Sequence, residues 1–233
     1  MAEHDQTQKR KTLSLKIKKP AIAEAPKAQV KKKSKLNPFY PLKYGEFRLK
    51  KKTFTVEPRI ITCLNRFIYR YRLAKIFKEI TVIDEKYMDK TIHGYSTANK
   101  LFLTHTAYEA VREAAIALGI SSKRYESLEI NPPLAARIRK NVKLKALLET
   151  EYAKPEVRKG VERFYHSALP SNNALQVAYM IRNCFGHGSF TTLGSGLNDK
   201  TYMDDIDALS EQLLEHCDML FDDSIAQCII LSS

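Results

Sequence analysis

The chain contains 233 residues, of which 39 are Lys or Arg and 26 are Asp or Glu, and its formal net charge is +13. With 44% hydrophobic residues it can bury a core, which excludes a wholly disordered chain. It has no apolar run of the ~18 residues that a membrane-spanning helix needs, and residues 1–40 lack the apolar centre of a secretory signal. We therefore expect a cytoplasmic protein without a membrane segment.

Most of the positive charge lies near the start of the chain. Residues 1–52 hold 16 basic and four acidic side chains, a net charge of +12, which leaves +1 for the other 181 residues. Residues 1–36 combine Lys clusters with no aromatic residue and no sustained hydrophobic period, which predicts a disordered basic arm. Such an arm attracts RNA by neutralising phosphates. The alternative is a solubilising tail without a specific partner.

The segment after the arm changes in composition. Residues 37–45 are turn-rich and aromatic, and the near alternation of apolar residues from Phe47 to Val56 predicts a short strand or an extended strap. A helix is expected from Pro58 to about residue 80, with its basic residues on the solvent face. That face is either simply solvated or a surface for phosphates. The candidate RNA-binding residues are Lys31, Lys32, Lys33, Lys35, Lys50, Lys51, Lys52, Arg66 and Arg70.

The rest of the chain is helical in pattern. Residues 81–96 resemble a connection, after which Ser96 or Thr97 is expected to cap a helix that Gly119 ends. Further helices are expected over about residues 133–152, 155–168, 174–185 and from 201 onward, the last with an acidic outer face. Six helices with little strand predict an all-α bundle.

We divide the chain into three parts. These are the arm at 1–36, the aromatic strap with the basic amphipathic helix at 37–95, and a helical bundle at 96–233. The pattern leaves open whether the Pro58 helix belongs to the bundle.

One segment carries residues suited to chemistry. Arg182, Asn183 and His187 lie where an apolar helix runs into a turn containing Gly186 and Gly188. An Arg followed by His at this spacing is expected about once by chance in such a chain, so spacing alone proves nothing. The Asn directly after the Arg, the position at a helix end and the amphipathic helix that follows give the pattern its weight.

This combination resembles the HEPN superfamily, the higher eukaryote and prokaryote nucleotide-binding domains, over roughly residues 96–230. The resemblance implies an α-helical bundle that dimerises so that the two motifs meet. It also implies a metal-independent endoribonuclease of a toxin–antitoxin, phage-defence or RNA-processing system, with an antitoxin or defence protein as a possible partner, or else a non-catalytic member. In toxins paired with a nucleotidyltransferase, a Tyr two residues beyond the His is modified; Ser189 at that position argues against this pairing.

The chemistry of RNA cleavage fits these side chains. His187 can act as base or acid near neutral pH. The permanently charged, fork-shaped Arg182 can hold a phosphate and stabilise the transition state, and Asn183 can orient His187 or a phosphate oxygen. Two symmetry-related motifs would then place two His and two Arg around one phosphate. We count Arg182, Asn183 and His187 as catalytic candidates, with His105, Glu109 and Ser189 as supporting ones.

Purely structural roles remain open for the same residues. Arg182 can cap the acidic C-terminal helix, and His187 can bond a carbonyl at a helix end. His105 and Glu109, one helical turn apart, form either a second shell around the motif or an ordinary half-buried pair. The competing function is a non-catalytic RNA-binding or scaffold protein, and a toxin-neutralising protein is a third.

The four cysteines predict neither disulfides nor a metal site. Cys63, Cys184, Cys217 and Cys228 show no zinc spacing. His216 and Cys217 are adjacent and would point about 100° apart on a helix, so they do not complete a site with Cys184 and His187. We expect reduced thiols, no metal and no cofactor.

Overall fold

The computed structural model describes residues 38–81, 89–150, 155–168, 171–186 and 200–233. The basic arm predicted at residues 1–36 lies outside these ranges. All secondary-structure elements in the described ranges are helices, which confirms the all-α prediction. The one β-type contact in these ranges is an isolated bridge between Glu129 and Asn173. None of the described helices has the length and apolar character needed to cross a membrane.

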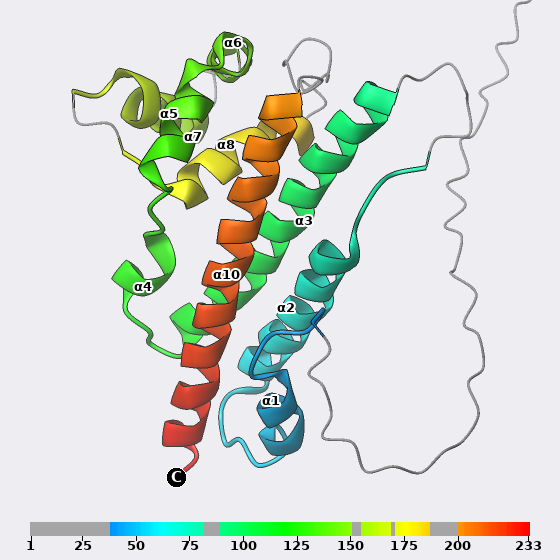
Figure 1. Cartoon of the computed structure of the whole chain (residues 1–233). Coiled ribbons are helices and arrows are strands. Elements are labelled where there is room, and N and C mark those ends of the chain that lie inside the picture. The colour runs from blue at the N-terminus through cyan, green and yellow to red at the C-terminus, as the bar shows by residue number, and fades with distance from the viewer. Residues whose placement is uncertain (1–37, 82–88, 151–154, 169–170, 187–199) are drawn as a thin grey trace, which may run out of the picture. The chain divides into compact units, whose positions relative to one another are not determined.

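The three longest helices form the body of the fold (Figure 1). They are α2 (Pro58–Ile76), α3 (Asp89–Ala117) and α10 (Lys200–Leu231). α3 packs along both of the others. α3 and α10 run in the same direction and α2 runs opposite to them. The parallel pair therefore needs a long connection, which the shorter helices supply.

α2 belongs to this body. Its apolar face is buried at the helical spacing expected from the sequence, and Leu64 and Phe67 are fully inaccessible. The ring of Phe67 lies 5.1 Å from that of Phe221 on α10, and the Tyr71 hydroxyl donates to Asp218 Oδ2 at 2.6 Å. Residues Leu36–Ser233 form one compact unit. Burial of this amphipathic face, rather than helix propensity, is what stabilises α2.

The short elements are α1 (Tyr44–Lys50), α4 (Ser122–Glu126), α5 (Pro132–Lys140), α6 (Val142–Thr150), α7 (Pro155–Val161), the π-helical turn η1 (Glu162–His166) and α8 (Ala174–Gly186). α5 to α8 gather at the end of the body where α3 and α10 begin (Figure 1). Arg139 joins this group: its Nε donates to the carbonyl of Phe164 at 2.8 Å and its Nη2 to Asn172 Oδ1 at 2.7 Å.

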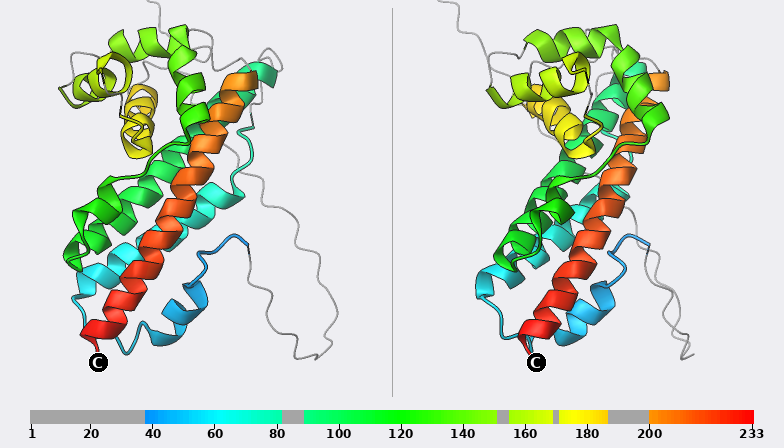
Figure 2. Two further views of the ribbon diagram at one scale, coloured as in Figure 1. Left: turned by 60° about the vertical axis from the view of Figure 1, so that its left-hand side comes forward. Right: turned by 90° about the vertical axis from the view of Figure 1, so that its left-hand side faces the viewer.

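The strand or strap predicted after residue 45 is wrong, because Tyr44–Lys50 is a helix. Glu46 pairs with Lys43 and Lys50 at helical spacing, which favours a turn of helix over an extended chain. Phe47 is 1% exposed and its ring lies 5.7 Å from that of Phe221, whereas Leu49 is exposed. Figure 2 shows α1 beside the C-terminal half of α10. Phe47 is the one buried residue of α1. The alternation of apolar residues in the sequence therefore does not correspond to one buried face of a strand.

Three further boundaries differ from the predictions. Ser96 and Thr97 do not start α3 but lie buried within it, and Ser96 Oγ accepts from the amide of Ile80 at 3.0 Å. The helix predicted over 133–152 is broken at Asn141, and the one predicted over 155–168 continues only as a π-helical turn to His166. Gly119, at φ 70°, follows the end of α3 as expected, because that conformation suits glycine.

Candidate functional site

The helix that carries the motif is fixed at its start. The Oδ1 of Asn173 accepts from the amides of Leu175 at 2.9 Å and Gln176 at 3.4 Å, and its Nδ2 donates to the carbonyl of Glu126 at 2.8 Å. Capping of this kind satisfies amides that a helix leaves unpaired. The apolar face of α8 is buried from Ala174 to Cys184. α8 is thus held against the body before the chain reaches the motif.

α7 approaches α8 closely through a glycine. A Cβ at Gly160 would lie 2.5 Å from Met180 Sδ, and Met180 is fully buried. A larger residue at position 160 would push α7 away from α8. The absence of a side chain there helps to fix the depth at which α8 sits.

Arg182 and Asn183 lie near the C-terminal end of α8 and bind each other. Arg182 Nη1 donates to Asn183 Oδ1 at 3.0 Å. Asn183 is 7% exposed, whereas the side chain of Arg182 keeps 28% of its surface open. The sequence predicts that Asn183 orients His187 or a phosphate oxygen; in the structure its oxygen holds the guanidinium of Arg182. The pair therefore presents a partly exposed, oriented cation.

The guanidinium of Arg182 reaches across to α3. Its Cζ lies 5.5 Å from the ring centre of Phe102, a cation–π contact, and its Nη2 lies 3.7 Å from Glu109 Oε1. The second distance is longer than a hydrogen bond, and the Glu109 side chain is 41% exposed, so the pair is weak. The described polar contacts of Arg182 go to α8 and α3, not to α10 as the capping alternative requires.

His105 is brought to the same place by α3. It is 3% exposed, with its ring 5.7 Å from that of Tyr108 and 5.8 Å from that of Tyr179. Burial, and then the nearby positive charge of Arg182, lower the pKa of His105 to about 4. The ring is thus neutral at pH 7, and its Nδ1, 3.6 Å from Glu109 Oε1, makes neither an ion pair nor a hydrogen bond with the described residues. A buried neutral ring suits positioning better than proton transfer.

The structure therefore brings Arg182 and Asn183 together with His105 and Glu109, for which the sequence left open a supporting role or an ordinary half-buried pair. His187 and Ser189 lie outside the described residues, as do Lys31, Lys32, Lys33 and Lys35. Sequence reasoning missed Phe102, which lies under Arg182. A signal existed, because Phe102, His105 and Glu109 follow the 3–4 spacing of one helix face.

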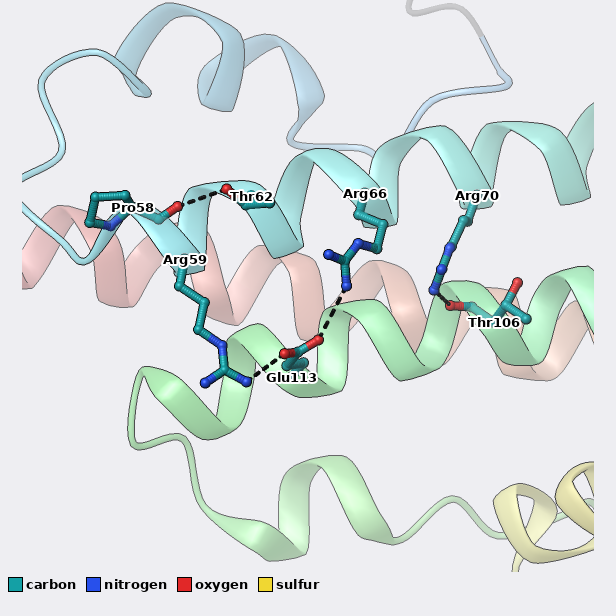
Figure 3. A network of polar contacts seen from close by, with 7 residues as sticks. All are labelled: Pro58, Arg59, Thr62, Arg66, Arg70, Thr106 and Glu113. Carbon is teal, nitrogen blue, oxygen red and sulfur yellow. Dashed lines mark hydrogen bonds and ion pairs between the residues drawn. The ribbon is translucent and has the colours of Figure 1, made fainter.

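Three arginines of α2 have partners on α3 (Figure 3). Arg59 Nη2 lies 2.6 Å from Glu113 Oε1, and Arg66 Nη1 lies 3.5 Å from Glu113 Oε2. Arg70 Nη1 donates to the carbonyl of Thr106 at 2.9 Å. The predicted solvent-facing role is therefore wrong for Arg70, which is half-buried, while Arg66 remains exposed. These three arginines join α2 to α3.

The cations at the end of α1 are more accessible. Lys50 pairs with Glu46 at 2.9 Å, Lys51 lies 5.9 Å from the ring centre of Phe47, and Lys52 is exposed. All three remain candidates for binding phosphates. Lys51 also lines a hollow together with Tyr40 and Tyr44.

The four cysteines are buried, and none forms a disulfide within the described residues. Burial raises the pKa of Cys217 and Cys228, the latter to about 11, so both stay protonated and unreactive at neutral pH. Within the described ranges no group of His, Cys, Asp and Glu residues is arranged to hold a metal ion. His187, one of the ligands considered from the sequence, lies outside those ranges.

Comparisons with protein-family models, with curated proteins and with solved structures found no match.

Proposed function

We propose that this protein is a HEPN-like, metal-independent endoribonuclease that acts as a dimer in the cytoplasm, in a toxin–antitoxin or phage-defence setting. One observation carries the proposal. Arg182 is a partly exposed arginine held by Asn183 and Phe102 near the C-terminal end of α8, five residues before His187. A planar, charged fork held in this way can receive a phosphate oxygen.

The proposed reaction needs only groups that the chain possesses. The 2′-hydroxyl of the RNA attacks the adjacent phosphorus, and the bond to the 5′-oxygen breaks. A base takes the proton of the 2′-hydroxyl and an acid gives one to the departing 5′-oxygen. His187 from each subunit would fill these roles, and Arg182 would stabilise the charge on the phosphorane oxygens. The products are a cyclic 2′,3′-phosphate and a 5′-hydroxyl.

The local electrostatics support this assignment of roles. His105 is the histidine that contacts the Arg182 cluster in the described structure, but its pKa of about 4 leaves it neutral and poorly suited to giving a proton at pH 7. Glu109 offsets the charge of Arg182 only loosely, at 3.7 Å. Arg182 therefore keeps positive charge for a phosphate, and proton transfer falls to His187.

The test is incubation of wild type and His187→Ala with total RNA in EDTA, followed by analysis of product ends. We expect cyclic phosphate ends from wild type and none from the variant. His166→Ala is the matched control, because His166 is an exposed histidine on η1 that contacts Glu149 at 3.1 Å, and it should cleave like wild type. Strict dependence on Mg²⁺, or equal cleavage by His187→Ala, would overturn the proposal.

The alternative is a non-catalytic RNA-binding or scaffold protein, which one surface favours. Tyr40 stacks on Tyr44 with ring centres 4.2 Å apart, and the Cζ of Arg72 lies 4.9 Å from the Tyr40 ring centre. They line a hollow of about 210 Å³ that also includes Tyr69 and Lys51. Aromatic rings beside cations are the usual platform for single-stranded nucleic acid.

Two variants distinguish the nuclease proposal from the non-catalytic alternative. Under the alternative, Tyr69→Ala should weaken RNA binding, since Tyr69 is 74% exposed and loses little packing, and His187→Ala should change nothing. Under the nuclease reading, His187→Ala abolishes cleavage while binding persists. Gel-shift and cleavage assays on the same two proteins decide between them.

A further inference from the structure

A cavity of about 820 Å³ lies at the end of the body where α3 and α10 begin. Its lining comes from the first described turn of α3, the junction of α5 and α6, and the first described turn of α10. Neither Arg182 nor any of its described partners lines it. The cavity is within the size range of small-molecule sites, and three separate segments of the chain form it.

Positive charge concentrates in this cavity. Lys90, Lys140, Lys143 and Lys200 line it, against a single carboxylate, Asp89. All four lysines are exposed, and none makes an ion pair with another residue in the described ranges. Elsewhere, by contrast, lysines on α1, α2 and α3 have acidic partners within 4.0 Å. Because residues 53–233 carry a net charge of only +1, four lysines around one hollow with no acidic partner among the described residues indicate an anionic ligand.

The start of α6 adds hydrogen-bond donors to that charge. Asn141 caps α6, because its side-chain Oδ1 accepts from the backbone amide of Leu144 at 2.7 Å. The backbone amide of Asn141 donates to the carbonyl oxygen of Ile138 at 3.2 Å. The next two amides, those of Val142 and Lys143, have no intrahelical acceptor, and both residues line the cavity. Unpaired amides at a helix start, with the positive end of the helix dipole, bind anions.

The side chain of Asn141 supplies an independent observation. Asn141 is 6% exposed and lines the cavity, yet its Nδ2 has no hydrogen-bond partner in the described part of the chain. An unpaired buried donor costs on the order of 1–3 kcal/mol, and such groups usually have a partner. Because less than 1 Å² of this nitrogen is accessible, an oxyanion held by the amides of Val142 and Lys143 would satisfy it only if the Asn141 side chain turns toward the ligand.

We propose that this cavity binds the phosphate group of a ligand larger than inorganic phosphate. Phosphate offers several acceptor oxygens and more than one negative charge, which matches convergent amides and four lysines. The inference does not depend on the endoribonuclease proposal, because none of the proposed catalytic residues lines the cavity. A phosphorylated small molecule and the backbone of an RNA strand share this chemistry.

The test uses inorganic pyrophosphate by calorimetry, and a short single-stranded RNA without terminal phosphates by fluorescence anisotropy. The RNA measurement is made in the His187→Ala background so that the strand stays intact. Asn141→Asp keeps the oxygen that caps α6 but replaces the Nδ2 donor with negative charge. Lys143→Glu reverses a charge at a helix position where Glu is favourable. Both variants should therefore fold, which circular dichroism would verify.

The control is Lys123→Glu, because Lys123 is exposed on α4 and does not line the cavity. We expect Asn141→Asp and Lys143→Glu to weaken binding by about tenfold or more, and Lys123→Glu by less than about twofold. If the two variants lose affinity for pyrophosphate, the ligand is a small phosphorylated molecule. If they lose affinity only for RNA, the ligand is the RNA strand. The proposal is wrong if neither probe binds, or if both variants bind both probes as the control does.

Discussion

Arg182 donates from Nη1 to the side-chain oxygen of its neighbour Asn183 at 3.0 Å. Adjacent residues on a helix point about 100° apart, so the long arginine side chain must bend back to make this bond. The bend lays the guanidinium over Phe102 and leaves part of it open. Two consecutive residues thereby act as one unit, which gives a physical reason for an Asn directly after the Arg.

The fork of Arg182 should matter more than its charge. Arg182→Lys keeps the charge but loses the planar fork that binds Asn183 and a phosphate together. We expect initial cleavage rates of labelled RNA to fall by about 10² or more, the loss typical of one transition-state donor. Arg163→Lys, at an exposed position on η1, should retain the wild-type rate. A rate for Arg182→Lys close to wild type would argue that the charge alone suffices.

His105 should make stability depend on pH in the acid range. Its pKa is lowered from 6.5 to about 4, so between these values the unfolded chain binds the proton and the folded one does not. The contribution of neutral His105 is complete above pH 6.5 and is lost as the pH falls toward 4, by on the order of 3 kcal/mol. Urea unfolding at pH 7 and pH 5 measures this.

The matched variant for this measurement is His105→Gln, which cannot titrate. Its stability should fall less than that of wild type between pH 7 and pH 5. His216, whose pKa is also lowered, first by burial and then by Arg124, titrates in both proteins and cancels in the difference. Identical pH profiles for the two proteins would show that His105 is not the buried neutral ring described above.

The attachment of α2 should depend on its apolar face and little on its arginine contacts. Phe67→Ala removes a fully buried ring and should cost about 3–5 kcal/mol. Glu113→Ala breaks the pairs with Arg59 and Arg66, but these are exposed and should contribute below about 1 kcal/mol. Chemical denaturation followed by circular dichroism gives both values, and a larger loss for Glu113→Ala would reverse this ranking.

The basic arm should control how RNA binding depends on salt. Removing residues 1–36 takes away 11 Lys and Arg, while the compact unit of Leu36–Ser233 keeps its core. The plot of log affinity against log salt should become shallower by about 0.7 for each arm side chain that contacts a phosphate. Cleavage of saturating RNA should change little. An unchanged slope would show that the arm does not touch the RNA.

Much of the fold could be predicted from local pattern. The apolar spacing of α2 and α10 and the glycine after α3 come from patterns that the backbone imposes on neighbouring residues. Prediction failed where contact with a residue distant in sequence determines the local structure. Phe47 turns α1 into a helix by packing on Phe221, and Ser96 lies inside α3 while bonding Ile80. The break between α5 and α6 arises because Asn141 caps α6, and the helical pattern of the residues on both sides gives no sign of it.

The candidate site divides in the same way. The sequence by itself determined which residues carry charge and titratable groups, that residues 1–52 hold a net charge of +12, and that Arg182 and Asn183 stand near a helix end, since these depend on order along the chain. Only the tertiary structure decided that Phe102, His105 and Glu109 meet Arg182, and that four lysines from three segments surround one cavity. These contacts depend on how α3 packs against α8 and α10. That packing is determined by the burial of apolar surface over the whole core, not by local residue spacing.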